Sequence, residues 1–316
     1  MNMRQVSNEL FMMDRNESLP TQHILIDYAL KVVTRQMEAL GRRDRTIEDY
    51  KRYMNSYTKT TNQTYIDEIT LDSIYSWLDS MDVQASTKRI RLKALKAILG
   101  KFYDNGWVEK RFWANITIKV DKKVKPCASE RDVALLLSML DLTNFIELRD
   151  ACAILLMYRC GLRLGTIATM QEEHIDFQNQ CLDLTGDVMK NHELLKLPVD
   201  EVTLSLLETL IQKNKTIRHK NKKRNSLVFI NKFGNTIQPT YSNNAIRKRL
   251  SIYSKMTGLE NINPHALRRG FATNLLKHGA SVPLISKALG HSDIAVTTQY
   301  LYLDTEQVAS ELRRYL

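Results

Sequence analysis

Apolar residues in the first third of the chain recur every three or four positions, which is the spacing of one buried helix face. Residues 24–37 and 46–57 both have this pattern, and Thr70 to Met81 follows as a third segment, with Thr70 or Asp72 near its N-cap. A fourth helix starts at Ser86, and its apolar side contains Ile90, Leu95, Ile98, Leu99 and Phe102. The pattern predicts a small bundle of about four or five helices.

The pattern changes beyond residue 118. The basic stretch KVDKKVKP has no apolar side chain larger than valine, and we interpret it as part of a linker over residues 119–127. Helices are predicted around Glu130 to Leu140 and Phe145 to Tyr158. The stretch CLDLTGDVMKNHELLKLPV, residues 181–199, alternates apolar and polar positions on both sides of a Gly-containing break, which predicts a β-hairpin.

The last part of the chain returns to helices with clear end signals. Asn263 followed by Pro264 predicts a helix start, and Gly279 is well placed to end that helix. Ser281 starts the next helix, and Gly290 stops it. We therefore predict a mainly α-helical chain with a small antiparallel β-sheet. Its parts are a flexible arm (1–20), a helical domain (21–118), the linker (119–127) and a mixed domain (128–316).

The composition is that of a globular protein. A chain of 316 residues with 43% hydrophobic content can form two domains, each with its own core. The longest apolar runs are far too short to cross a bilayer, and no basic stretch followed by an apolar one begins the chain, so we expect a soluble, unexported protein. The four cysteines lack paired spacing, which predicts reduced, mostly buried thiols rather than a zinc site or disulfides.

Positive charge is concentrated in two stretches. The formal net charge is +11, which suits a polyanionic partner. No carboxylate occurs in residues 209–259 or 83–103, although each stretch contains several cations. Two basic surfaces would suit a protein that grips a phosphate backbone from two sides, and solvated helix faces are the alternative. The candidate DNA-binding residues in the shorter stretch are Lys88, Arg89, Arg91 and Lys93.

Several residues with useful chemistry lie in the second half of the chain. His265 and Arg268 in NPHALRRGFATNLLKHG are three apart, so they share one helix face. Arg163 follows a turn at Gly161, and Lys190 lies at the tip of the predicted hairpin. Taken alone, each is more often an ordinary capping, surface or solvated residue.

The stretch LGHSDIAVTTQYLYLD contains His291, Tyr300 and Tyr302. Tyrosines flanked by leucines usually belong to a packing surface. A phenol held beside basic residues can instead attack an electrophile and form a covalent intermediate. By itself, this stretch favours packing for both tyrosines.

The order and spacing of these residues together resemble the catalytic signature of the tyrosine recombinase family, which includes phage integrases and Xer-like proteins. The signature consists of GLR, a Lys 8 residues before the Pro of KLPV, HALRRG, LGHSD with its His 23 residues after Arg268, and a Tyr 9 residues after that His. TIEDYKRYM, STKRIRLKALKAILGKFYDNGW and WANI also resemble that family's core-binding domain. The resemblance covers nearly the whole chain.

The resemblance implies a fold and a set of residue roles. It implies a two-domain DNA clamp, with a SAM-like helical core-binding domain at 21–118 and a catalytic domain at 128–316. Tyr300 would be the nucleophile, whereas Tyr302 falls outside the spacing and keeps the packing role. His265 would be the base and His291 a phosphate ligand. The full set of implied catalytic residues is Arg163, Lys190, His265, Arg268, His291 and Tyr300.

The chemistry explains why these residue types are needed. In-line attack on a phosphodiester builds charge on its non-bridging oxygens, and the planar donor forks of two arginines can absorb that charge. A lysine on a hairpin tip can protonate the leaving 5′ oxygen. The phosphotyrosyl link conserves the energy of the broken phosphodiester bond, so no nucleotide cofactor is expected. Because the arginines replace a metal, no divalent ion is expected.

One position departs from the family pattern. Relatives commonly have a Ser-Glu pair after the GLR turn, whereas this chain has Gly165 and Thr166. A carboxylate that could orient Arg163 is therefore missing, and another group is expected to hold this arginine.

The resemblance also implies partners and a role. The expected partner is a specific site in double-stranded DNA, bound by a homotetramer with accessory DNA-bending or directionality proteins, in the cytoplasm at the nucleoid, with a bacterial or phage origin. Residues 303–316 would dock on a neighbouring subunit or pack on their own domain. The expected role is integration or excision of a mobile element, with Xer-like dimer resolution, a type IB topoisomerase and an inactive DNA-binding relative as alternatives.

Overall fold

The computed structural model describes residues 23–121, 125–185, 194–238, 243–291 and 294–298. Contacts between residues divide the chain into two compact units, Met1–Lys122 and Lys123–Leu316. Each unit has its own hydrophobic core, so the two are described separately. Among the described residues, no helix is both long and apolar enough to cross a membrane.

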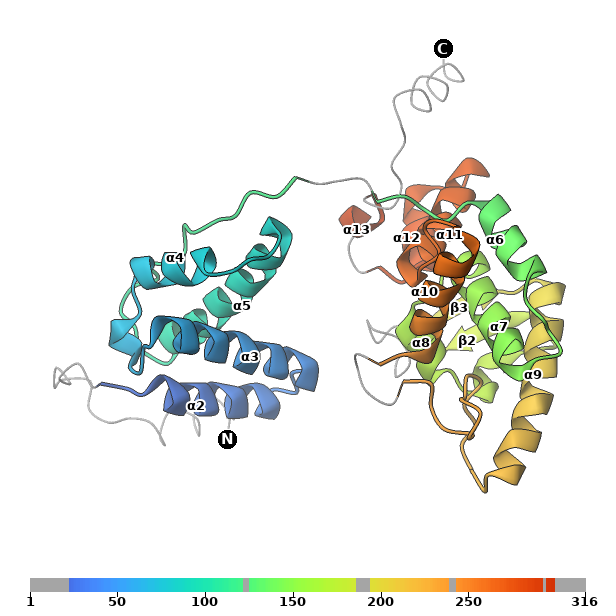
Figure 1. Cartoon of the computed structure of the whole chain (residues 1–316), viewed down its shortest axis with the longest axis horizontal. Coiled ribbons are helices and arrows are strands. Elements are labelled where there is room, and N and C mark those ends of the chain that lie inside the picture. The colour runs from blue at the N-terminus through green and yellow to red at the C-terminus, as the bar shows by residue number, and fades with distance from the viewer. Residues whose placement is uncertain (1–22, 122–124, 186–193, 239–242, 292–293, 299–316) are drawn as a thin grey trace, which may run out of the picture. The chain divides into compact units, whose positions relative to one another are not determined.

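The N-terminal unit is a helical bundle (Figure 1). Its described α-helices are α2 (Ile26–Ala39), α3 (Asp44–Thr61), α4 (Leu71–Asp79) and α5 (Ala85–Asp104), with the short 3-10 helix η1 (Ile66–Glu68) before α4. Helix α3 packs against the other three α-helices. Tyr57, Trp77 and Phe102 are fully buried in the common core, so the bundle predicted from apolar spacing is present.

The start of α4 follows its local sequence. The Thr70 hydroxyl accepts a hydrogen bond from Ser73 N at 3.2 Å, and Ser73 Oγ accepts one from Thr70 N at 2.9 Å. This reciprocal pair satisfies two backbone donors that the first turn of a helix leaves without partners. Thr70 is therefore the N-cap, and Asp72 lies inside the first turn.

Helix α5 carries the shorter acid-free stretch, and its buried face differs in part from the prediction. The buried residues are Leu92, Leu95, Ile98, Leu99 and Phe102. Ile90 is 60% exposed, so its assignment to the apolar side was wrong. Two residues correspond to about 200° of helical rotation, which turns Ile90 away from the face that Leu92 occupies. The N-cap is Gln84, so the assignment of Ser86 as the start was also wrong.

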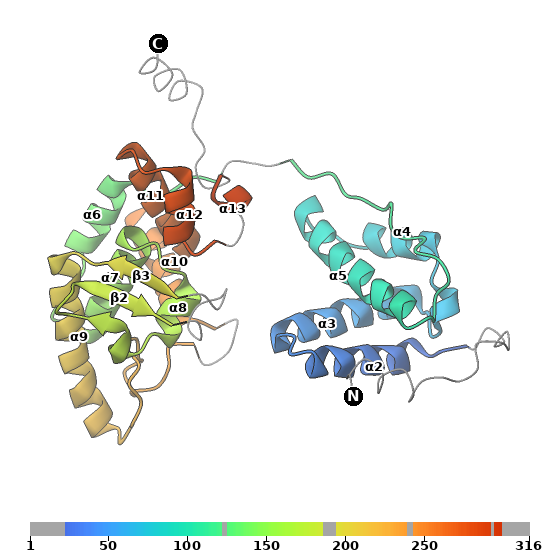
Figure 2. The same ribbon diagram turned by 180° about the vertical axis from the view of Figure 1, so that it is seen from behind.

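The C-terminal unit contains a three-stranded antiparallel sheet. Its strands are β1 (Ile175–Asp176), β2 (Cys181–Leu184) and β3 (Leu195–Pro198). Cys181 pairs with Pro198 and Leu184 with Leu195, so β2 and β3 form the predicted hairpin. Figure 2 shows this sheet in front of α7. The hairpin tip with Lys190 falls within residues 186–193, outside the described residues.

Helices make up most of this unit. Four helical elements precede the sheet in sequence: α6 (Glu130–Ser138), α7 (Phe145–Arg159), the short α8 (Leu164–Thr169) and the 3-10 helix η2 (Glu172–His174). The later helices are α9 (Glu201–Lys220), α10 (Ala245–Thr257), α11 (Pro264–Lys277), α12 (Val282–Ala288) and α13 (Ile294–Thr298).

The ends of α11 and α12 agree with the sequence signals. The Asn263 side chain accepts a hydrogen bond from Ala266 N at 3.0 Å, and the Ser281 hydroxyl accepts one from Leu284 N at 3.4 Å. Gly279 and Gly290 follow the two helices with φ of 86° and 57°. The four predicted end signals are thus confirmed, because glycine takes up this left-handed conformation without a steric cost.

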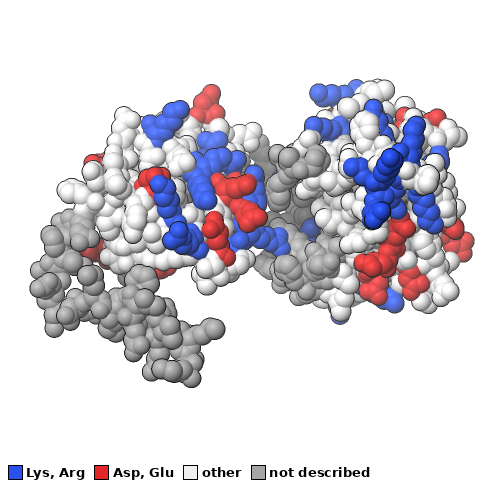
Figure 3. Space-filling view, turned by 90° about the horizontal axis from the view of Figure 1, so that it is seen from below, with Lys and Arg blue, Asp and Glu red and all other residues white. Residues whose placement is uncertain are grey.

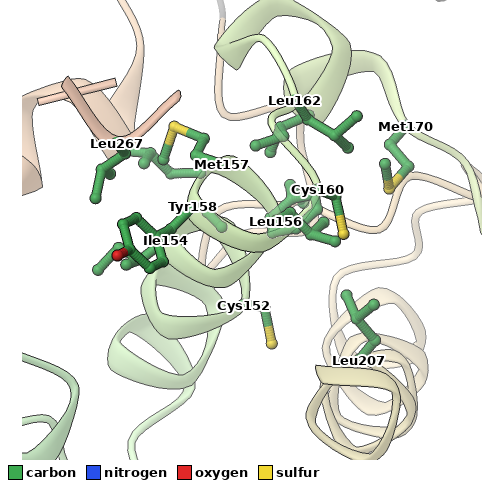
Figure 4. Close-up of a cluster of buried hydrophobic side chains, with 14 of the residues drawn as sticks. Cys152, Ile154, Leu156, Met157, Tyr158, Cys160, Leu162, Met170, Leu207 and Leu267 are labelled. Atoms are coloured by element: carbon green, nitrogen blue, oxygen red, sulfur yellow. The ribbon is translucent and has the colours of Figure 1, made fainter. Parts of the chain in front are cut away.

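Helix α7 forms the centre of the larger core. Every residue from Leu148 to Tyr158 is buried, and its side chains point outward on all sides (Figure 4). Leu207 from α9 and Leu267 from α11 pack around it. A helix buried on all faces provides a fixed frame for the elements packed against it.

The residue that follows α7, Cys160, is a buried free thiol, and its burial raises the thiol pKa to about 12.

A buried ion pair links α7 to α10. Asp150 is 0% exposed, and Oδ1 accepts a hydrogen bond from Arg149 Nη2 at 2.7 Å. Its Oδ2 accepts bonds from Arg249 Nε at 2.9 Å and from the Tyr253 hydroxyl at 2.8 Å. These contacts satisfy a charge that would otherwise be costly to bury, and they fix α10 on the central helix.

Candidate active site

The turn after α7 brings the first arginine to the site. Gly161 has a φ of 64°, and Leu162 N donates a hydrogen bond to Leu156 O at 3.1 Å, which closes the helix end. A Cβ at Gly161 would collide with the Phe271 ring. Glycine is therefore required here both for its backbone conformation and for the close approach of α11.

Arg268 lies on α11 and is 3% exposed. Its Nη1 donates to Gly161 O, and its Nη2 donates to Leu289 O at 2.5 Å. Arg268 therefore joins three segments: α11, the turn after α7 and the end of α12. A guanidinium in this position is anchored before any ligand arrives, which is the condition for a preorganised anion site.

Arg163 is held by a backbone carbonyl. Its Nη2 donates to Gly290 O at 3.0 Å. Leu289 and Gly290 follow the last turn of α12, where carbonyl groups lack helical partners, so the two arginines satisfy neighbouring acceptors at the same helix end. This contact provides a support for Arg163 where the usual glutamate is missing. Thr166 is buried within α8 at 3% exposure.

His291 lies beside the two arginines. Its Nε2 lies 3.0 Å from Arg268 Nη2, and its Nδ1 lies 2.8 Å from Thr297 Oγ1. Partial burial, together with the charges of Arg268 and Arg163, lowers the pKa of His291 from 6.5 to about 4. The imidazole is therefore neutral near pH 7. We call Arg163, Arg268 and His291 the basic centre.

His265 lies one turn before Arg268 on α11, at the surface. Partial desolvation lowers the pKa of His265, and the nearby charges of Arg269 and Arg268 add to that effect. A histidine that is neutral near pH 7 can accept a proton, as a general base must. The structure thus places His265 on the same helix as Arg268, as predicted.

The two remaining candidates, Lys190 and Tyr300, lie outside the described residues, and so does Tyr302. The described chain ends at Thr298 in α13, two residues before Tyr300. Their assigned roles stay predictions. Among the described residues, no group of three or more His, Cys, Asp or Glu side chains is arranged to hold a metal ion.

The candidate DNA-binding residues lie in the first half of α5. Arg89 and Lys93 are exposed, and Lys88 and Arg91 are partly exposed. No ion pair within the described chain includes any of the four. Lys96, further along the helix, donates instead to Ala114 O at 2.6 Å and Ile116 O at 3.0 Å, so it has a structural role.

The longer acid-free stretch divides into structural and exposed cations. Arg218 donates to Glu172 at 2.6 Å, and Arg249 belongs to the buried network around Asp150. Other cations line a cavity of about 520 Å³ between α10 and the start of α11, where Arg247, Lys248 and Lys255 lie along α10 and Asn263 lies at the start of α11. On the face drawn in Figure 3, Lys and Arg gather in groups with acidic side chains beside them.

Two residues near the site were not singled out from the sequence. Thr297 contacts His291, and Arg269 donates to Pro126 O through Nε at 3.0 Å and Nη2 at 2.6 Å. Ala128 N also donates to Ala266 O at 3.0 Å, so residues 126–128 are bound along the start of α11. The second arginine of HALRRG was a visible signal, whereas nothing in the sequence distinguished Thr297 from Thr298.

Comparisons with known proteins agree with this geometry. The model of the phage integrase family matches residues 129–307, more than half of the chain. The chain is 30% identical over 199 residues to tyrosine recombinase XerC of Alcanivorax borkumensis. The aligned region covers 61% of this chain and 62% of that relative. The chain is 24% identical over 276 residues to tyrosine recombinase XerD of Vibrio cholerae. Here the aligned region covers 85% of this chain and 89% of that relative.

Solved structures share the fold at low sequence identity. The Tn1549 transposon integrase in complex with transposon right end DNA has a TM-score of 0.71 at 17% identity, covering 91% of this chain and 99% of that chain. The lambda integrase dimer bound to a COC′ core site has a TM-score of 0.68 at 14% identity, covering 94% and 84% respectively.

Proposed function

Because this chain belongs to the phage integrase family of tyrosine recombinases, we propose that it cuts and rejoins specific double-stranded DNA sites through a covalent 3′-phosphotyrosyl link to Tyr300. One observation carries the proposal most directly. Arg163, Arg268 and His291 come from three separate segments, yet the carbonyls of Leu289 and Gly290 and the Arg268–His291 contact hold them together. Two anchored guanidinium groups suit a phosphodiester that gains charge during attack.

In the proposed first step, the Tyr300 oxygen forms a bond to the phosphorus while the bond from phosphorus to the 5′ oxygen breaks. His265 accepts the phenolic proton, and Lys190 gives a proton to the departing 5′ oxygen. The products are a 3′-phosphotyrosyl link and a free 5′ hydroxyl. Attack by a 5′ hydroxyl of another strand reverses the same step and releases Tyr300.

The basic centre would contribute mainly through charge. Arginine stays protonated at any relevant pH, and its planar donors match the geometry of phosphate oxygens. The low pKa of His291 means that this ring adds no third full charge in the absence of DNA. Loss of one preorganised donor typically lowers the rate about 10² to 10³-fold. Arg163 and Arg268 are therefore expected to matter more than His291.

We propose two surfaces for the DNA backbone. Lys88, Arg89, Arg91 and Lys93 on α5 would contact phosphates from the N-terminal unit. On the C-terminal unit, the cavity with Arg247, Lys248 and Lys255 would do so beside α11, the helix that carries Arg268. The expected assembly is a homotetramer on two sites, with accessory DNA-bending or directionality proteins. The proposed docking segment, residues 303–316, lies outside the described residues.

The test is formation of a covalent protein–DNA adduct. A nicked substrate that loses a short fragment after cleavage prevents rejoining, so an active enzyme accumulates as an adduct that survives denaturation. The account expects this adduct in the presence of EDTA. If DNA is bound specifically and no adduct forms, the chain is a DNA-binding relative without activity. Recombination between two DNA molecules distinguishes a recombinase from a topoisomerase.

Two biological roles fit this chemistry. We propose integration or excision of a mobile element as the first. The match to XerD of Vibrio cholerae over 85% of this chain favours resolution of chromosome or plasmid dimers as the second. The DNA beside the gene separates them. Element junctions with repeated ends support the first role, and recombination at a site on an otherwise ordinary chromosome or plasmid supports the second.

A further inference from the structure

Thr297 connects the basic centre to the short helix α13. Its side chain is 0% exposed, and its Oγ1 lies 2.8 Å from His291 Nδ1. The other nitrogen of the same ring, Nε2, lies 3.0 Å from Arg268 Nη2. One imidazole therefore bridges an arginine of α11 and a threonine that precedes Tyr300 by three residues in sequence.

The partners of the ring determine its protonation state. A guanidinium group donates hydrogen bonds and accepts none, so Nε2 must carry the lone pair that faces Arg268. The proton of a neutral imidazole then lies on Nδ1, and Nδ1–H donates to the Thr297 hydroxyl. The charges of Arg268 and Arg163 and partial burial oppose a second proton, which agrees with the low pKa of His291.

We propose that Thr297 is a positioning residue of the active site, whose hydroxyl holds the His291 ring through Nδ1 while Nε2 faces Arg268. The inference rests on the proposed function, in which His291 binds the reacting phosphate. It assigns to Thr297 no contact with DNA and no proton transfer to substrate. Its effect on the reaction is exerted through His291.

A hydroxyl suits this role better than an acceptor such as a carboxylate. When a phosphate oxygen comes within reach, Nε2 must donate rather than accept. The ring can reach that state if Nδ1 loses its proton to solvent and Nε2 takes one from solvent. Thr297 can then donate its own hydroxyl hydrogen to Nδ1, because a hydroxyl both donates and accepts. The contact is thus kept in both tautomers.

The same contact holds α13 to the site. Helix α13 packs against α12, and the carbonyls just beyond α12 accept hydrogen bonds from Arg163 and Arg268. Thr297, His291 and both arginines therefore form one connected set. The alternative is that Thr297 is only a buried hydroxyl with a satisfied hydrogen bond. That alternative predicts an effect on stability but none that depends on His291.

Ring nitrogen chemical shifts of His291 in DNA-free protein test the contact directly. The account expects the Nδ1–H tautomer near neutral pH in the wild type. Thr297→Val keeps the shape of the side chain and removes the hydroxyl, so Nδ1–H loses its hydrogen-bond acceptor and the Nδ1 signal should shift. Thr297→Ser should restore the wild-type spectrum. An Nε2–H tautomer in the wild type, or unchanged signals in Thr297→Val, overturns the proposal.

A double-mutant cycle in the adduct assay tests the consequence for cleavage. Loss of one hydrogen bond should slow adduct formation about tenfold in Thr297→Val, and Thr297→Ser should stay within about threefold of wild type. In a His291→Ala background, Thr297→Val should change the rate by less than about twofold. Equal slowing in both backgrounds shows a purely structural role and rejects the proposal. If the wild type forms no adduct, the proposed function fails. The spectra still test whether Thr297 is hydrogen-bonded to His291.

Discussion

Arg268 and His291 are 23 residues apart in sequence, yet Arg268 Nη2 and His291 Nε2 lie 3.0 Å apart. The contact forms because α11 and α12 pack against each other and Gly290 turns the chain back after α12. A cation beside an imidazole opposes protonation of the ring. This relationship makes the electrostatic state of the site testable without any DNA.

We expect His291 to weaken the folded state in mild acid. The pKa of His291 is 6.5 in the unfolded chain and about 4 in the folded one. Between these values the unfolded state binds more protons, so stability falls as pH falls. Urea denaturation at about pH 7 and about pH 5 should show a smaller loss in His291→Gln than in wild type. An equal loss in both proteins would show that Arg268 and Arg163 do not oppose protonation of His291.

The general-acid role of Lys190 can be tested with a modified leaving group. Lys190→Ala should slow adduct formation by about 10²-fold or more on ordinary DNA. A substrate with sulfur in place of the leaving 5′ oxygen should restore most of the rate, because a thiolate departs without an acid. Lys196→Ala, which removes an exposed lysine on β3 of the same hairpin, is the control. Lack of rescue would contradict the assigned role.

The basic part of α5 should contribute to the salt dependence of DNA binding. Replacing Lys88, Arg89 and Arg91 with glutamine should lower affinity and reduce the slope of log K against log salt by about 1 for each lost phosphate contact. Lys31→Gln, which removes a charge paired with Asp27 on α2, should have a smaller effect. An unchanged slope in the triple variant would mean that this part of α5 does not touch phosphate.

Asp150 should be important for stability rather than for chemistry. Asp150→Asn leaves Arg149 buried without its charge partner, and we expect a loss of about 3 kcal/mol in the free energy of unfolding. Glu147→Gln affects a longer, partly exposed pair with Arg249 at 3.8 Å, and should cost less than about 1 kcal/mol. Chemical denaturation of both variants provides the comparison. Equal losses would contradict the structural importance of the buried pair.

Local sequence signals were sufficient for most of the fold. Asn263 and Ser281 have side chains that cap helices by short-range hydrogen bonds, so their positions could be recognised without tertiary information. The hairpin followed from alternating apolar residues. Ile90 was misassigned because a helix face is selected by what packs on it. The short elements β1 and α8 have too few residues to show a period.

The sequence predicted which residues form the site, but not the hydrogen bonds that hold them together. The family resemblance provided His265, Arg268, Arg163 and His291, and the structure gathers the last three. No sequence pattern indicated that Arg163 would donate to Gly290 O, because a backbone carbonyl carries no sequence signature. The contact between Thr297 and His291 was missed for a similar reason, since only the folded structure shows that Thr297 is buried and the adjacent Thr298 is exposed.

The identity of the nucleophile tests the central claim most directly. Adduct formed on a nicked DNA substrate would be digested, and mass spectrometry of the DNA-linked peptide would identify the modified residue, with Tyr300→Phe and Tyr302→Phe compared under the same conditions. The account predicts a 3′-phosphate linked to Tyr300, no adduct in Tyr300→Phe with DNA binding intact, and a normal adduct in Tyr302→Phe. An adduct on Tyr302, or one that persists in Tyr300→Phe, would contradict it.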